Sequence, residues 1–166
     1  FDDVLLGPEM PRSMELINTI AITLHEAAGH GIVGWYFHKH FGDLAGDPVS
    51  SATIVARSKS LGHVMSIPEK DYALGRTKAY YRNKIAMTTG GRLAEILYMG
   101  PDNESPGAAG DIQQATQMAT AMVTAWGMSE RIGFRSCTRE SLDGSHAMDE
   151  LVQEEVKAVI DQQYKL

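Results

Sequence analysis

The sequence predicts a compact, mainly α-helical domain with one small β-hairpin, and three observations carry that prediction. Apolar residues recur at intervals of three and four over several long stretches, which is typical of amphipathic helices. A single region, residues 51–68, is rich in strand-forming residues. A chain of 166 residues with 43% hydrophobic side chains is long enough for one core, so we expect a single domain over residues 1–166.

The first half of the chain is expected to hold one helix and the hairpin. Residues 13–40 form the helix, because apolar side chains recur along one face of it: Ile17, Ile20, Ala21, Leu24, Ala28, Ile32, Trp35 and Tyr36. Residues 41–50 contain Gly, Asp and Pro and are expected to form a loop. The stretches 51–58 and 61–68 form the two strands around a Ser-Lys-Ser connection.

The second half is expected to be helical. Residues 77–98 form a helix, although the adjacent Gly90 and Gly91 each weaken it by roughly 1 kcal/mol; such glycines often permit close contact between helices. A loop over residues 100–110 precedes a helix over residues 111–126 that ends at a glycine. The last helix covers residues 145–164.

Charge and cysteine content exclude several classes of protein. The net charge of -6 argues against a nucleic-acid partner, because phosphate binding needs a clustered positive field. A single cysteine, Cys137, forms no internal disulfide, so we expect a reducing compartment. The chain has no apolar run of about 18 residues, so we expect no membrane span here. It opens without a start Met or a basic leader, so we expect no signal peptide here and expect the chain to be a piece of a longer protein.

The stretch His-Glu-Ala-Ala-Gly-His, residues 25–30, places two histidines around a glutamate within the first helix. Zinc in hydrolases is held by three protein ligands and keeps an open position for water, and two histidines one helical turn apart supply two of those ligands. In the HExxH motif the glutamate beside the first histidine is the general base. His25, Glu26 and His30 are therefore candidates for these roles.

The spacing departs from the HExxH motif by one inserted residue. His25 and His30 are five residues apart, which on a regular α-helix leaves them roughly 140° apart around the axis. A π-bulge absorbs one inserted residue, and such bulges are frequent at functional sites. Ala27, Ala28 and Gly29 are small enough to permit one. We therefore predict a bulge between His25 and His30.

A regular helix is the alternative. Glu26 and His30 would then lie on one face, His25 would point elsewhere, and the usual base would be missing. A histidine in a helix is also more often solvated or hydrogen-bonded than a metal ligand. No ligand spacing links the remaining histidines, which are expected on the surface or in loops: His38, His40, His63 and His146.

The motifs around these histidines resemble, in the same order, the peptidase domain of FtsH-type ATP-dependent zinc metalloproteases. They span nearly the whole chain: FDDVLLGPE, HEAAGH, ATIVAR with LGHVMSIPE, GGRLAEILYMG, GAAGDIQQATQMATAMVTAWGMSERIG and VQEEVKAVIDQQY. Residues 107–133 are the most specific part. The resemblance implies the proteolytic part of such an enzyme, with residues 1–12 following an absent ATPase domain.

The resemblance also implies roles for individual residues. His25 and His30 match the family's histidine ligands, and Glu26 matches the glutamate that activates water. Asp111 matches the aspartate that is the third metal ligand. Glu95, in GGRLAEI, matches a glutamate that lies near the metal behind the ligands. The family reads HEAGH where this chain reads HEAAGH.

Asp111 and Glu95 also have plain structural interpretations. Asp111 with Gln114 resembles a capping box, which stabilises a helix by about 1 kcal/mol, and this role is compatible with metal binding through one carboxylate oxygen. Glu95 could be a solvated helix acid or a partner for Arg92, three residues earlier.

The resemblance implies a zinc-dependent endopeptidase that hydrolyses peptide bonds of unfolded proteins. Its cofactor is Zn²⁺, while ATP is used by an ATPase domain that this chain does not contain. Under this resemblance an exposed edge strand of the hairpin is expected to align an extended substrate by main-chain hydrogen bonds; a hairpin that merely covers the helical core is the alternative.

The family's domains form hexameric rings beneath an ATPase ring, so the full-length protein is expected to be a homo-hexamer with unfolded polypeptides as partners. It would be membrane-associated only through absent segments, with this domain soluble on the cytoplasmic or organellar interior side. The rival hypothesis is a catalytically inactive relative that serves as a ring-forming scaffold or interaction module, because the insertion has disrupted the metal site.

Overall fold

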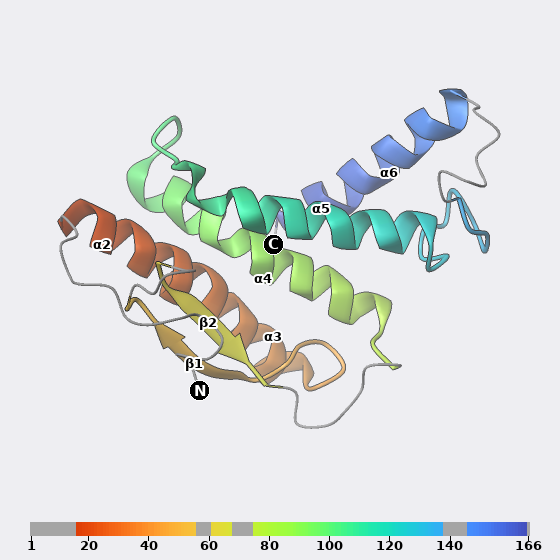
Figure 1. Ribbon diagram of the computed structural model, residues 1–166. Coiled ribbons are helices and arrows are strands. Elements are labelled where there is room, and N and C mark those ends of the chain that lie inside the picture. Colours follow the sequence, from red (N-terminus) through yellow and green to blue (C-terminus); the bar gives the residue numbers. More distant parts are fainter. Residues whose placement is uncertain (1–15, 56–60, 68–74, 138–145, 166) are drawn as a thin grey trace.

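The computed structural model describes residues 16–55, 61–67, 75–137 and 146–165 (Figure 1). The expected N-terminal segment, residues 1–12, lies outside the described residues. The elements are α2 (Leu16–Thr23), η1 (Leu24–Gly31), α3 (Ile32–Phe41), β1 (Val49–Thr53), β2 (His63–Ser66), α4 (Lys78–Met99), η2 (Pro106–Ala108), α5 (Ala109–Thr124) and α6 (His146–Gln163). The prediction of a mainly α-helical fold with one small hairpin is confirmed.

The first predicted helix is continuous but not uniform, because α2, η1 and α3 follow one another and η1 is a π-helix. One extra residue in a turn rotates everything after it by about 100° relative to a regular helix. Ile32, Trp35 and Tyr36, expected on the apolar face, are accordingly exposed by 60%, 54% and 47%. Gly34 and Phe37 are buried instead.

The hairpin is a two-stranded antiparallel sheet in which Thr53 pairs with His63 and Ser51 with Met65. An irregularity in register lies between Val49 and Ser51. β1 begins at Val49, so the last two residues of the predicted loop belong to the strand; this part of the prediction was wrong because Val49 still finds a partner beyond the irregularity, Ser66. The predicted connection between the strands lies outside the described residues.

α4 agrees with its predicted range to within a residue, and its two ends have clear causes. The Thr77 side chain caps the first turn by accepting a hydrogen bond from the Tyr80 N–H at 3.1 Å. Gly100 ends the helix with a positive φ of 83°, a conformation that favours glycine. α4 is the central helix of the fold: Figure 1 shows it between the α2–η1–α3 rod on one side and α5 on the other.

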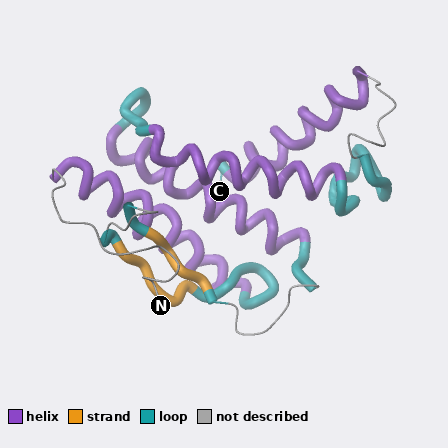
Figure 2. The backbone as a smooth tube through the Cα atoms, viewed as in Figure 1, coloured by secondary structure: helices purple, strands orange, loops and turns teal. Residues whose placement is uncertain are grey.

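The hydrophobic core lies where α4, α5 and α6 meet. Its buried members are Ile85, Ala115, Ala119, Met122, Val123, Ile132, Cys137, Val152 and Val156. Burial of these apolar surfaces at about 25 cal/mol per Å² is the main stabilising contribution. Figure 2 shows the hairpin on the opposite side of the fold, next to the helices that carry residues 16–41.

The start of α5 differs from the prediction. The helix begins at Ala109 and is preceded by the 3₁₀ turn η2, whose cap is the Ser105 side chain. Asp111 therefore lies inside the first turn, and the predicted capping box with Gln114 is wrong. Pro106, directly after Ser105, has the fixed φ that favours the first position of a helical turn, so the helical segment starts earlier than the acid.

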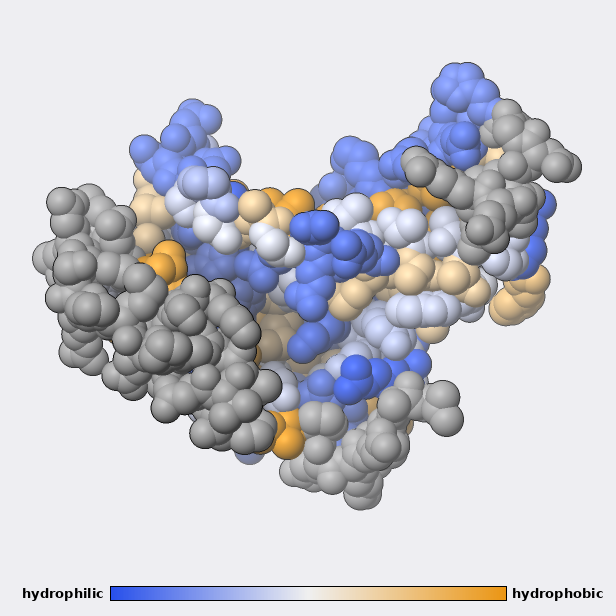
Figure 3. All heavy atoms as spheres, in the orientation of Figure 1, coloured by the Kyte–Doolittle hydropathy of each residue, from blue (hydrophilic) through white to orange (hydrophobic). Residues whose placement is uncertain are grey.

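The outer surface is polar at two places, the loop that follows α4 and the start of α6 (Figure 3). In Figure 3 hydrophilic residues cover the loop around residues 100–105 and the start of α6. Among the described helices, none combines the length and the apolar character that crossing a bilayer requires.

Candidate metal centre

η1 brings the two histidines of the motif to one side of the helix. The Ile32 N–H bonds to the carbonyl of Ala27, five residues back, which is the hydrogen bond that defines a π turn. The rings of His25 and His30 lie edge to face with centroids 4.8 Å apart. The predicted bulge is confirmed, and the alternative of a regular helix with diverging histidines is wrong.

A close approach between η1 and α4 explains why small residues stand at this turn. A Cβ atom on Gly29 would lie 2.5 Å from the Gly91 Cα, and a Cβ on Gly90 would lie 2.7 Å from the Gly29 carbonyl oxygen. No side chain fits between the two backbones at these distances. The expectation that Gly90 and Gly91 permit close helix contact is confirmed.

α4 orients both imidazole rings through their Nδ1 atoms. His25 Nδ1 lies 3.3 Å from Glu95 Oε1, and His30 Nδ1 lies 2.7 Å from the Met87 carbonyl oxygen. Residues 87, 91 and 95 are spaced by four and therefore share one face of α4. Since both partners accept hydrogen bonds, they favour a proton on Nδ1, so Nε2 is the atom of each ring that can carry either a proton shared with Asp111 or a metal ion.

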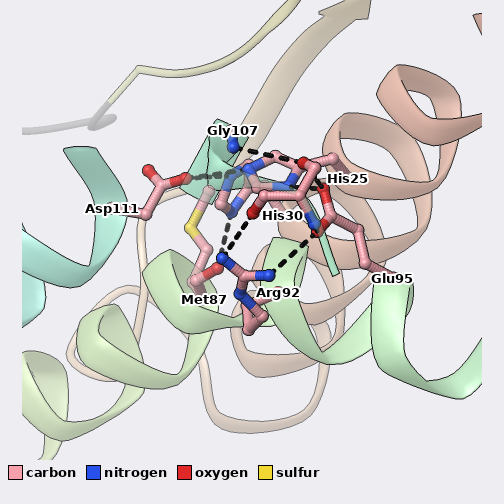
Figure 4. Close-up of polar contacts among 8 residues, drawn as sticks. His25, His30, Met87, Arg92, Glu95, Gly107 and Asp111 are labelled. Atoms are coloured by element: carbon pink, nitrogen blue, oxygen red, sulfur yellow. Dashed lines mark hydrogen bonds and ion pairs between the residues drawn. The ribbon is translucent and has the colours of Figure 1, made fainter. Parts of the chain in front are cut away.

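The two Nε2 atoms converge on Asp111. Its Oδ2 atom lies 2.8 Å from His25 Nε2 and 3.4 Å from His30 Nε2 (Figure 4). The side chains of His25, His30 and Asp111 are 11%, 12% and 27% exposed, so the group is largely shielded from solvent and Asp111 is its most exposed member. One ligand atom from each of the three residues lies within 4.8 Å of the others.

The contacts within this group shift the pKa values of Asp111 and His30, each toward the charged form of its side chain. Burial alone would raise the pKa of Asp111, but the hydrogen bonds from His25 and His30 outweigh it and hold that pKa well below its usual range. Burial alone would lower the pKa of His30, but its bonds to Asp111 and to the Met87 carbonyl outweigh it and raise that pKa. Asp111 is thus kept ionised, as a metal ligand must be.

Glu26 lies beside this group and next to the hairpin. A Cβ on Gly62, directly before β2, would lie 2.9 Å from Glu26 Cγ, so the strand and the glutamate are in close contact. Burial is the largest influence on Glu26 and raises its pKa, while the positive charges of the nearby histidines act in the opposite direction.

Glu95 is only 2% exposed, so its interpretation as a solvated acid is wrong. It does pair with Arg92, as the second structural interpretation expected, at 3.4 Å from Nη1 to Oε2. It also accepts hydrogen bonds from the backbone N–H and the hydroxyl of Ser105, at 3.2 and 3.1 Å. Its carboxylate is therefore turned toward His25 and the loop before α5.

Three contributions to the site were not predicted. The Met87 carbonyl is a backbone group and has no signal in the sequence. Ser105 had a signal, because serine followed by proline is a common start of a helical turn. His63, expected on the surface or in a loop, lies on β2 with both ring nitrogens buried and without a hydrogen-bond partner among the described residues.

The donor set fits a zinc ion. Zinc accepts imidazole nitrogen and carboxylate oxygen, and in catalytic sites three such ligands leave one position open. His25, His30 and Asp111 offer two nitrogens and one oxygen, and each imidazole has the second hydrogen bond that metal-binding histidines commonly make. Helix-borne histidines next to a glutamate, with a carboxylate from another helix nearby, are the arrangement found in zinc-dependent hydrolases.

Sequence comparison identifies the family within this class. Residues 13–166 match the description Peptidase family M41, and the chain belongs to this family. The resemblance to the peptidase domain of FtsH-type zinc metalloproteases is thereby confirmed.

Proteins named ATP-dependent zinc metalloprotease are among the relatives. FtsH of Rickettsia bellii is 35% identical over 99% of this chain and 26% of its own length. YME1L of Drosophila melanogaster is 36% identical over 99% of this chain and 22% of its own length. Human YME1L1 is 38% identical over 80% of this chain and 16% of its own length. The chain thus spans about a quarter or less of the length of these relatives.

Deleting Ala28 should leave zinc binding within about threefold of the wild-type affinity, a difference of about 0.7 kcal/mol. The deletion gives the HEAGH spacing, in which the histidines are four residues apart and share a face of a regular helix. Adding a further alanine after Ala28 should abolish zinc binding, because neither an α nor a π turn aligns residues six apart. Competition titration with a chromophoric chelator measures both. Loss of binding on deletion would mean that the site depends on the wide turn itself.

Proposed function

We propose that this chain is a zinc-dependent endopeptidase, a single domain over residues 1–166 that hydrolyses peptide bonds of unfolded proteins. His25, His30 and Asp111 would hold the metal and Glu26 would act as general base. The observation that supports this most is the convergence of both Nε2 atoms on one carboxylate oxygen, at 2.8 and 3.4 Å, despite the inserted residue. Membership of peptidase family M41 supports the reaction class.

The residues of the chain divide the reaction between them. When bound, zinc polarises the scissile carbonyl and acidifies a water molecule. Glu26 removes the proton from that water and later delivers it to the leaving amine. Burial, which raises the pKa of Glu26, makes its carboxylate a stronger proton acceptor. Glu95 and the Met87 carbonyl hold the imidazole rings in the orientation that points Nε2 at the metal.

The hairpin would position the substrate. β1 and β2 form a two-stranded sheet, so each strand has one edge that is not paired within the described residues. An extended peptide adds to such an edge through main-chain hydrogen bonds, which recognise an unfolded chain more than a particular sequence. The contact between Gly62 and Glu26 supports this role, because it places the start of β2 beside the proposed base.

The properties of the full-length protein are part of the same proposal. We expect an ATPase domain to use ATP and feed this domain, a homo-hexameric ring, and membrane association through segments other than the helices described above. The relatives named ATP-dependent zinc metalloproteases are about four to six times as long as the stretch they share with this chain. The domain would then lie on the cytoplasmic or organellar interior side.

The rival hypothesis of an inactive scaffold rested on the inserted alanine. It predicts a metal site disrupted by the insertion. The turn of η1, which places the histidine rings 4.8 Å apart, supports the enzyme over the scaffold. Zinc-free protein with intact helical content would favour the scaffold.

The test of the proposed function is digestion of casein, an unfolded substrate, by the zinc-loaded chain. We expect cleavage that stops when a chelator removes the metal and returns when zinc is added back. We expect a tightly folded protein of similar size to stay uncut, because the proposed strand edge takes up an extended chain. Zinc-loaded chain that leaves casein intact would contradict the proposal.

A further inference from the structure

A network of contacts behind His25 connects the two parts of the chain that carry the proposed metal ligands. We propose that Ser105 is a positioning residue that, together with Arg92, holds Glu95 and the first turn of α5 in place, and so fixes His25 relative to Asp111 before any metal binds. This inference rests on the proposed function for its consequence, but its geometry is independent of the metal.

The carboxylate of Glu95 is fully engaged by this network. Oε1 accepts from His25 Nδ1 at 3.3 Å and from the Ser105 hydroxyl at 3.1 Å. Oε2 accepts from the Ser105 N–H at 3.2 Å and from Arg92 Nη1 at 3.4 Å. Each oxygen therefore has two donors, which offset the cost of burying a carboxylate that is only 2% exposed. Ser105 supplies two of the four.

Ser105 also determines where α5 begins. Its hydroxyl accepts a hydrogen bond from the Gly107 N–H at 3.1 Å and so caps η2, which leads directly into α5 and Asp111. Arg92 closes the network from the other side, because its Nη2 atom donates to the Ser105 carbonyl at 2.6 Å. Arg92 thus bridges Ser105 and Glu95, which a lysine would not reproduce.

The contacts form a closed circuit. Asp111 meets His25 at Nε2, and His25 meets Glu95 at Nδ1 (Figure 4). Glu95 in turn meets Ser105, and the turn capped by Ser105 returns to Asp111. The circuit joins η1 to α4 and α5, which come much later in the sequence. Removing the Ser105 hydroxyl opens it at one point and leaves one oxygen of a buried carboxylate with a single donor.

The test compares Ser105→Ala with Ser105→Thr in the full chain. Partners behind metal-binding histidines typically contribute about 10- to 100-fold to metal affinity. We expect Ser105→Ala to weaken zinc binding by about 10-fold, the lower end of that range, and Ser105→Thr, which keeps the hydroxyl, to restore it to within about threefold. Competition with a chromophoric chelator gives the zinc affinity. Thr116→Ala is the matched control, since its hydroxyl on the exposed side of α5 bonds to the Ile112 carbonyl.

A second measurement follows the His25 ring in the metal-free protein by ¹⁵N-edited NMR. We expect a slowly exchanging Nδ1–H in wild type and in Ser105→Thr, and faster exchange in Ser105→Ala. Equal zinc affinity and equal exchange in wild type and Ser105→Ala would overturn the positioning role, as would equal weakening by both substitutions. Wild type that binds no zinc would instead overturn the proposed function, and the exchange rates would still decide the role of Ser105.

Discussion

Replacing Glu26 with glutamine is expected to lower the rate of casein hydrolysis by about 10²- to 10⁴-fold, the contribution of a general base. Glutamine has nearly the same size and still fits against Gly62, where the glutamate Cγ lies close to the start of β2. The glutamine amide does not accept a proton, so the attacking water is not deprotonated. The effect should appear in kcat more than in KM, since the substitution leaves unchanged the strand that we propose binds the substrate.

The control for this substitution is zinc content. Glu26 is not among the three residues whose ligand atoms converge, so Glu26→Gln should retain one zinc per chain. A variant that keeps both zinc and hydrolytic rate would show that another group removes the proton. The nearby charge of His63, which lowers the pKa of Glu26, makes His63 the first residue to examine in that case.

Replacing Gly91 with alanine is expected to weaken zinc binding by about 10- to 100-fold and to destabilise the fold by about 1–3 kcal/mol. A Cβ at this position would lie 2.5 Å from both Cε1 and Nε2 of His25, well inside any permitted contact. Either the ring turns away from Asp111 or α4 moves away from η1. The first response separates His25 Nε2 from Asp111, and the second moves Glu95, which orients the His25 ring, away from that ring.

Gly110→Ala is the matched control. Gly110 lies in α5, one residue before Asp111, and a Cβ there would meet nothing within 4 Å. Alanine in a helix is favoured over glycine by roughly 0.5–1 kcal/mol, so this variant should melt slightly higher and bind zinc as wild type does. Thermal melting and zinc titration of both variants make the comparison. Equal zinc affinity in Gly91→Ala and Gly110→Ala would contradict the packing described for His25.

The sequence predicted the helices well because their patterns are local. The run 77–98 begins at its capping residue, Thr77, and is followed closely by the glycine that ends the helix, Gly100. The bounds of α4 agree with the run to within a residue. The bulge at η1 was also predictable, because two histidines five residues apart cannot share a face of a regular helix. The consequence for the residues after the bulge was missed, since Ile32, Trp35 and Tyr36 were assigned to one apolar face by counting through the insertion.

The parts of the site that sequence reasoning missed depend on contacts between distant elements. The Met87 carbonyl orients His30 only because η1 and α4 approach closely at their glycines. Ser105 belongs to the site only because the side chain of Glu95 turns toward the loop before α5. The predicted cap at Asp111 failed because Ser105 and Pro106 start the helical turn earlier, and this releases the carboxylate to face the histidines.

X-ray absorption spectroscopy of the zinc-loaded chain tests the central claim most directly, together with the zinc content per chain. We predict one zinc per chain with two imidazole nitrogens and one carboxylate oxygen in its coordination sphere, at about 2.0–2.2 Å. His30→Ala should remove one imidazole from that spectrum. A chain that binds no zinc, or that binds it through a single imidazole, would contradict the claim that η1 delivers both histidines to one metal.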